Sequence, residues 1–307
     1  MAGVIATISV VAGCSSSVDG QGGPSDETTT VADSELASDV PKGYDPCTDM
    51  AVMSDWTWDP DDFAALWLNE ANDRFPRPLH YLSRFRYLED FQAHKSRVLE
   101  RYSREEFEEI ELALRTLTNS ALRIEIRGST TNTNKARVRE YRILGARDAF
   151  YSVIAAQAVH DGSHGPIRVR IVQPEKLPVL LSNWLPSCEP GRHHSATFHM
   201  QDLRDDSGGL FESDAYNSPQ EQYRRLVGRK LDGGGNAGLL VGDILARPNP
   251  WNTLRWHDIR NDGRYLERRA ADHVTVQPAS PQEITNIFST WFDRAITRLR
   301  EEGEVSW

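Results

Sequence analysis

The spacing of apolar residues changes from a helical period to a strand period along the chain. Asp59 and Pro60 can open a helix, because Asp caps a helix N-terminus and Pro is tolerated in the first turn. Apolar residues recur at helical spacing over 85–102 and 103–117, which predicts two more helices. From Leu122 to Arg127 apolar and polar residues alternate, which indicates a half-buried strand.

The same order of elements occurs twice after residue 53. Each series of strands ends in Val-Gln-Pro, at 172–174 and again at 276–278, and a helix with a tryptophan follows. The predicted strands are 122–127, 137–144, 150–159 and 167–172 in the first series and 237–246, 252–259, 264–268 and 273–276 in the second, which also has helices at 219–230 and 281–301. We interpret this order as a duplicated unit, with halves at 53–190 and 191–307.

These elements predict an α+β fold with a central antiparallel or mixed sheet, flanking helices and two quasi-symmetric halves. The simplest arrangement merges the two strand sets into one sheet with the helices on one side. Residues 128–135 are polar and are predicted to form a loop between two strands, and the glycines at 233–235 are predicted to precede a strand. Loops on a rigid sheet commonly bind partners.

The first 52 residues differ in composition from the rest. An apolar run ends in Val11-Ala12-Gly13-Cys14, which resembles a bacterial lipobox whose cysteine is lipidated, and a polar tract predicted to be disordered follows. Two interpretations stay open. The segment is a leader that anchors the protein at the cell envelope through Cys14, or it is an unrelated lipoprotein start joined to a body that begins at Met53. The lack of Lys and Arg before Cys14 favours the second.

Charge and composition narrow the classes of partner. The chain carries a net charge of −10, of which residues 1–52 contribute −7, so the body is nearly balanced. Neither a nucleic-acid partner nor a membrane association of the body is therefore expected, and no apolar run reaches membrane-spanning length. Hydrophobic residues make up 39% of the chain, which is typical of a globular protein.

Candidate catalytic groups are scattered rather than grouped at useful spacings. His193, His194 and His199 lie near one another, but no paired ligand stands a few residues away as structural zinc sites require, so we expect no metal. Cys188 is interpreted as a loop thiol, because a nucleophile would need a histidine folded against it. No phosphate-binding glycine motif is present, so we expect neither a cofactor nor enzymatic activity.

An ordered set of segments in 53–307 is similar to the EspG family, the secretion-associated proteins of type VII (ESX) systems. The segments are Trp58-Asp-Pro-Asp-Asp-Phe63, Leu122-Arg-Ile-Glu-Ile-Arg-Gly128, Leu254-Arg-Trp256-His-Asp258-Ile-Arg-Asn-Asp-Gly263-Arg264-Tyr265 and Val274-Thr-Val-Gln-Pro278. The resemblance implies an α+β fold of two quasi-symmetric halves, as the repeat does. It also implies a cytoplasmic chaperone, present as a monomer or homodimer, that binds PE–PPE heterodimers at the tip of the PPE subunit.

The family's binding surface involves the sheet, a loop between early strands and the C-terminal helical region. By position, the resemblance assigns the loop role to Thr130, Asn132, Asn134 and Lys135 as rim contacts. Leu239, Leu240 and Val241 are candidate apolar anchors, and their alternative interpretation is ordinary sheet core. The competing function is a cell-envelope lipoprotein, anchored through Cys14, with a ligand- or protein-binding domain.

A fragment of residues 53–307 is predicted to stay in solution and to hold a PE–PPE pair at about micromolar affinity or tighter, since a weaker complex does not survive purification. Co-expression with the pair encoded nearest to the gene, followed by size-exclusion chromatography with mass determination, checks this. Separate elution of fragment and pair would contradict the assignment and favour the lipoprotein alternative.

Overall fold

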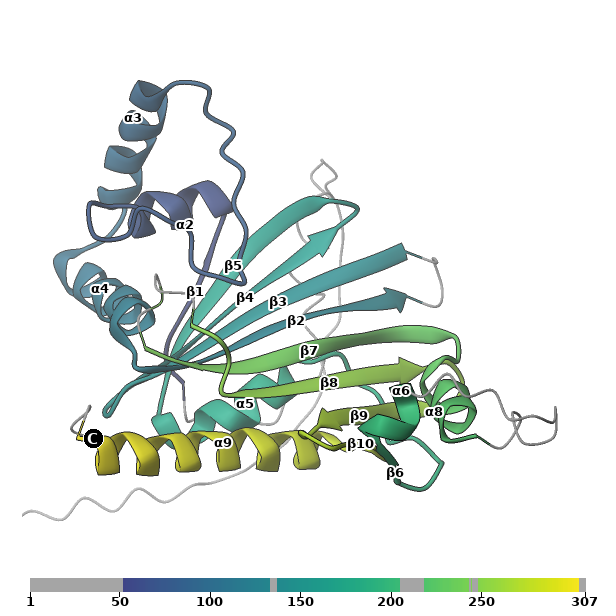
Figure 1. Ribbon diagram of the computed structural model, residues 1–307. Helices are drawn as coiled ribbons and strands as arrows, with labels where there is room; N and C mark the ends of the chain where they lie inside the picture. The colour runs from purple at the N-terminus through teal and green to yellow at the C-terminus, as the bar shows by residue number, and fades with distance from the viewer. Residues whose placement is uncertain (1–51, 133–136, 205–217, 243, 245–247, 304–307) are drawn as a thin grey trace, which may run out of the picture. The chain divides into compact units, whose positions relative to one another are not determined.

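A computed structural model describes residues 52–132, 137–204, 218–242, 244 and 248–303 (Figure 1). Ten strands of this part form one open antiparallel sheet in the order β1-β5-β4-β3-β2-β7-β8-β9-β10-β6. The strands are β1 (Val52–Trp58), β2 (Leu122–Asn132), β3 (Arg137–Arg147), β4 (Ser152–His160), β5 (Ser163–Val172), β6 (Ala196–His199), β7 (Leu231–Val241), β8 (Asn252–Ile259), β9 (Gly263–Arg269) and β10 (His273–Pro278). The helices are α2 (Pro60–Trp67), α3 (Leu88–Leu99), α4 (Arg104–Asn119), α5 (Leu177–Asn183, after the 3-10 turn Pro174–Lys176), α6 (Met200–Arg204), α8 (Pro219–Val227) and α9 (Pro281–Glu302).

The strand order is symmetric about the β2–β7 pair. On one side lie β2, β3, β4 and β5 as a meander, followed by β1 at the edge; on the other side lie β7, β8, β9 and β10, followed by β6. In each half an edge strand comes first in the chain, helices follow, and the meander ends in a helix, α5 or α9. The architecture therefore has the two quasi-symmetric halves that the repeated element order predicts.

Two aromatic rings lie on two glycines at the centre of this symmetry. The register aligns Tyr141, Gly128, Gly235 and Trp256 across β3, β2, β7 and β8. Trp256 Nε1 donates to Tyr141 Oη at 3.2 Å, and Tyr141 Oη donates to the Gly234 carbonyl at 3.2 Å. A Cβ on Gly128 would stand 2.2 Å from Tyr141 Oη, and one on Gly235 would stand 2.5 Å from Trp256 Cζ2, so neither position has room for a side chain.

Helices cover both faces of the sheet, which corrects the expectation that they lie on one side. We call the face that carries Leu122, Ile124 and Ile126 the inner face; it packs against α5 and α9 in one core. Because side chains alternate along a strand, Leu144 and Ala146 point to the other face, the outer face. There they pack against α2 and α4 in a second core. The alternation of apolar and polar residues predicts which side chains share a face of the sheet. It does not predict which helices pack on that face.

Capping residues that are visible in the sequence mark the ends of several helices. Ser103 and Glu106 form a reciprocal capping box at the start of α4, and Ser280 and Glu283 form another at the start of α9. Gly303 adopts the left-handed conformation that ends α9. The helix predicted over 85–102 is shorter, because α3 begins only at Leu88. The helix α6 was not predicted.

Two stretches predicted as loops belong to strands. β2 continues through Gly128 to Asn132 and pairs residue by residue with β3, so the predicted loop 128–135 is wrong over its first five residues. The glycines at 233–235 lie inside β7, which ends at Val241 rather than at 246. In both places a strand persists because aromatic side chains of the neighbouring strands fill the space above the glycines. Asp161 and Gly162 form the tight turn between β4 and β5, with φ of 48° and 81°.

Replacing Gly128 or Gly235 by Val is expected to lower the free energy of unfolding by about 1–3 kcal/mol, because each new side chain overlaps the Tyr141 or Trp256 ring. Chemical denaturation measures the change. Gly238→Val on β7 is the matched control, since a Cβ there meets nothing closer than Pro250 Cβ at 3.2 Å. Equal unfolding free energies for Gly128→Val and the wild type would contradict the packing constraint.

Candidate partner-binding surface

Among the described residues, the outer face of the sheet is exposed over part of its central strands, where Arg127, Asn236 and Arg255 are accessible to solvent. A hollow of about 580 Å³, which we call the central hollow, is lined by residues of β2, β3, β7 and β8. Its walls include the apolar Val138 and Leu231, which are 53% and 42% exposed. These two side chains offer apolar contacts within one hollow, whereas α2 and α4 pack on the same face of the first half beyond the hollow.

Glycines make the floor of the central hollow shallow and backbone-lined. Gly233, Gly234 and Gly235 line it from β7. A Cβ on Gly233 would stand 2.8 Å from the Ser129 carbonyl oxygen, and one on Gly234 would stand 2.7 Å from that of Trp256. The register of β7 against β8 shifts between Leu231 and Gly233, a bulge of the kind that re-aims side chains. A partner can therefore approach the backbone closely between the side chains of Val138 and Leu231.

Polar residues form one side of the central hollow, the side nearer the middle of the sheet. Arg127, Asn236 and Arg255 are exposed and follow one another in register across β2, β7 and β8. On the next strand, Arg142 pairs with Glu140, with Nη2 3.3 Å from Oε2. The hollow thus combines apolar walls with a polar rim, as protein interfaces do.

A buried carboxylate lies beside the central hollow. Glu267 on β9 is 3% exposed; His257 Nε2 lies 3.0 Å from its Oε2, and Arg269 Nε donates to its Oε1 at 2.8 Å. Burial alone would raise the pKa of Glu267, but hydrogen bonds from His257, Arg269 and Tyr223 outweigh it and lower the pKa to about 2. Because Tyr223 belongs to α8, this carboxylate joins that helix to the sheet.

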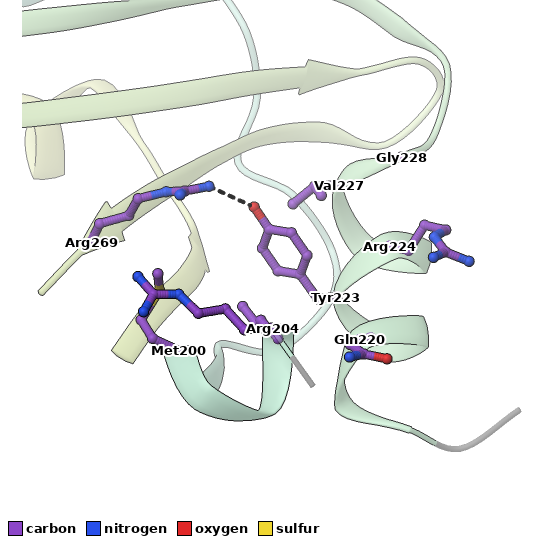
Figure 2. Close-up of a pocket in the computed structure, with 9 residues that line it drawn as sticks. Met200, Arg204, Gln220, Tyr223, Arg224, Val227, Gly228 and Arg269 are labelled. Carbon is purple, nitrogen blue, oxygen red and sulfur yellow. Dashed lines mark hydrogen bonds between the residues drawn. The ribbon is translucent and has the colours of Figure 1, made fainter. Parts of the chain in front are cut away.

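A second hollow of about 590 Å³ lies between α6 and α8, and we call it the helix groove (Figure 2). Met200, Leu203 and Val227 supply apolar lining, and Arg204 and Arg269 supply charge. Figure 2 shows Tyr223 reaching from α8 toward Arg269, with the Tyr223 hydroxyl 3.4 Å from Arg269 Nη2. Because His257 lines the central hollow and Tyr223 the helix groove, Glu267 contacts the lining of both.

The segment from Asp258 to Tyr265, which carries part of the family resemblance, has a structural role. Arg264 is buried and forms a bidentate pair with Asp258, at 2.6 and 2.8 Å, while its Nη2 also donates to the Pro186 carbonyl. Burial and the nearby Asp258 carboxylate raise the pKa of the Cys188 thiol to about 11, so this thiol stays protonated and is a weak nucleophile at neutral pH. In the described ranges no group of three or more His, Cys, Asp or Glu side chains could hold a metal ion.

The structure does not bring together the loop residues that the sequence analysis assigned as partner contacts. Thr130 lies on β2, opposite Arg139 and Gly233, and alternation puts it on the inner face, so its neighbours Ser129 and Thr131 line the central hollow instead. Asn132 ends β2, and the side chain of Asn132 and the whole of Asn134 and Lys135 lie outside the described residues, as does Cys14. The strand alternation of 122–127 continues through Ser129 and Thr131. Extending this pattern along the sequence would have assigned these two residues to the face of Arg127.

The candidate apolar anchors lie in or near the core. Leu239 is fully buried in the inner-face core, and Val241 packs against that core. Leu240 is 9% exposed and lies on the opposite side of β7 from Leu239. All three therefore match the alternative interpretation of sheet core, whereas the exposed apolar side chains that line the central hollow are Val138 and Leu231.

Acidification is expected to weaken the fold through Glu267. Its pKa is about 2 in the folded protein and ordinarily 4.5, so its stabilising contribution is complete above 4.5 and is lost as the pH falls toward 2. Denaturation curves measured between pH 6 and pH 2.5 should show a steeper loss for the wild type than for Glu267→Gln. Parallel curves for the two proteins would show that Glu267 is not the titrating group.

Comparison with known proteins identifies the family. No helix in the part of the chain described here is long and apolar enough to cross a membrane. A search of curated proteins found no match. The family model described as the EspG family matches residues 59–287, which is most of the chain and includes both hollows. The protein therefore belongs to the EspG family of ESX secretion-associated chaperones.

Proposed function

We propose that this protein is the chaperone of a PE–PPE heterodimer, which it binds at the tip of the PPE subunit and delivers to an ESX secretion system. Membership of the family supports the secretion role. The observation that carries the binding role is the central hollow, an uncovered part of the outer face with apolar walls and a polar rim. We place the protein, accordingly, in the cytoplasm.

Binding would act on the client by covering apolar surface. A secreted helical pair with an apolar tip self-associates when that tip is exposed, and Val138 and Leu231 offer it a complementary contact. A chaperone that binds the folded pair stabilises it by mass action and adds no covalent step. Release then needs only a competing partner or dilution, because nothing in this proposal fixes the client permanently.

The two hollows form one extended surface in this proposal. The central hollow takes the tip itself, and the helix groove beside it takes the side of the same helical client. Glu267 supports both, because it holds His257 at one hollow and Tyr223 at the other. A client that touches both hollows would bury more area than either offers alone, which a stable complex needs.

The full chain is expected to form a ternary complex when it is co-expressed with the PE–PPE pair encoded nearest to its gene. Size-exclusion chromatography with mass determination distinguishes a co-eluting complex from separate species. A complex of one chaperone with one pair is the expected mass. A pair that remains soluble alone and elutes apart from the chaperone would overturn the proposed function.

The double variant Val138→Asp with Leu231→Asp is expected to weaken the complex by about tenfold or more, because it puts two charges against the apolar tip of the client. The matched control is Phe150→Asp, an 80% exposed apolar residue that does not line the central hollow. Titration calorimetry on the purified proteins compares the two. If Phe150→Asp weakens binding and the double variant does not, the client binds elsewhere.

A further inference from the structure

Two arginines of the central hollow stand in a single row across the sheet. The register pairs Arg127 on β2 with Asn236 on β7, and Asn236 with Arg255 on β8. All three residues are exposed. Since neighbouring strands lie about 4.8 Å apart, the two arginine backbones are about 10 Å apart on the same face. The row crosses the seam between the two halves of the protein.

Arg127 and Arg255 have no ion-pair or hydrogen-bond partner among the described side chains, in contrast to the arginines around them. Arg142 pairs with Glu140, and Arg269 pairs with the buried Glu267. Arg123, which precedes Arg127 on the same face of β2, donates to the Gly242 carbonyl at 2.5 Å. The two open guanidinium groups therefore stand out within a surface whose other cations are already engaged.

The register sets the buried carboxylate of Glu267 opposite Arg255, and hydrogen bonds from His257 and Arg269 already engage that carboxylate. The hollow beside the row favours the close approach of a further anion. The row borders a hollow whose floor is glycine backbone, so a docked partner excludes water from the guanidinium groups at close range. Charged groups in such a concave site interact more strongly than on a flat surface, because low-dielectric walls focus the field. Arginine favours carboxylate and phosphate groups, which it can bind through two parallel hydrogen bonds.

The charge of the whole chain distinguishes these two ligand classes. Residues 53–307 carry a net charge of only −3 and so lack the positive charge that binds a continuous phosphate backbone, whereas a partner protein can present a few carboxylates beside an apolar surface. The apolar Val138 and Leu231, which line the same hollow as the row, fit the second kind of partner.

We propose that Arg127 and Arg255 select the client by binding carboxylate side chains on its docking surface, at a spacing set by the strands β2 and β8. This inference rests on the proposed function and names the client chemistry that the central hollow recognises. The client is an acidic-flanked apolar helix end. Its apolar residues meet Val138 and Leu231, and Asp or Glu residues about two to three helical turns away meet the two guanidinium groups, because Arg127 lies four residues along β2 from the partner of Val138.

The test uses the full-length chain and its PE–PPE pair, with affinity measured by calorimetry or interferometry at low and high salt. Arg127→Glu with Arg255→Glu is expected to weaken the complex at least tenfold, and the wild-type affinity should fall as salt rises from 50 to 500 mM, because salt screens exposed charges. Arg127→Lys with Arg255→Lys keeps the charge and should retain most of the affinity. Arg115→Glu, an exposed arginine on α4 away from the hollow, is the matched control and should bind as the wild type does.

An exchange of charges between the chaperone and its client tests which client carboxylate the two arginines bind. In the PE–PPE pair, Asp and Glu residues at the PPE tip are changed to Arg one at a time, and each is combined with the double Glu variant. Recovery of at least part of the lost affinity by one such exchange identifies the carboxylate and supports the proposal. Circular dichroism and chromatography of each variant show that a lost complex is not a lost fold.

These experiments distinguish a failure of the carboxylate inference from a failure of the proposed function. If the wild type binds the pair and the double Glu variant binds as tightly, the carboxylate inference is overturned and the proposed function stands. If the wild type itself binds no pair, the proposed function is overturned and the inference with it. Tighter binding of the wild type to a single-stranded RNA or DNA oligonucleotide than to the pair would also overturn it, because the row would then serve phosphates.

Discussion

The packing of Tyr141 and Trp256 onto Gly128 and Gly235 is the constraint on which the rest of the sheet depends. The two rings share a hydrogen bond and leave no room for a Cβ on either glycine. Because one ring comes from each half, the contact holds β2 against β7 and thereby joins two five-stranded sets into one sheet. The inner face gains a continuous core there. On the outer face, Gly234 stands opposite Ser129 and leaves backbone exposed in the central hollow.

Much of the fold follows from periodicity and capping. The strand β8 was predicted to the residue, because apolar Leu254 and Trp256 alternate with polar residues along Asn252–Ile259. The capping residues Ser103 and Ser280 mark their helices, since a hydroxyl and a Glu three residues later satisfy free backbone amides there. The two Val-Gln-Pro segments indicated the duplication, because both halves must leave the sheet through the same kind of turn into a helix.

The residues of the candidate site were harder to predict from the sequence than the helices and strands were, and the reason is physical. Polar and glycine-rich residues in 128–132 and 233–235 resemble loop, yet neighbouring aromatic rings hold them in strands. Once they are strands, alternation decides that Ser129 and Thr131, not Thr130, face the hollow. Arg127 and Arg255 are 128 residues apart in the chain and become neighbours only through the register of three strands. A single sequence carries no mark of that register.

The strand order also has a kinetic consequence. Every pairing within each meander joins strands that follow one another directly, so those hairpins form by closing short loops. The seam between β2 and β7 instead brings Leu122 to Val241, and it is the only strand pairing between the halves in the described sheet. Contacts so distant in sequence form slowly, which places the seam late in folding. Until it forms, each half presents an open strand edge that contains glycines, and a second unfinished chain can pair with that edge in place of the proper half.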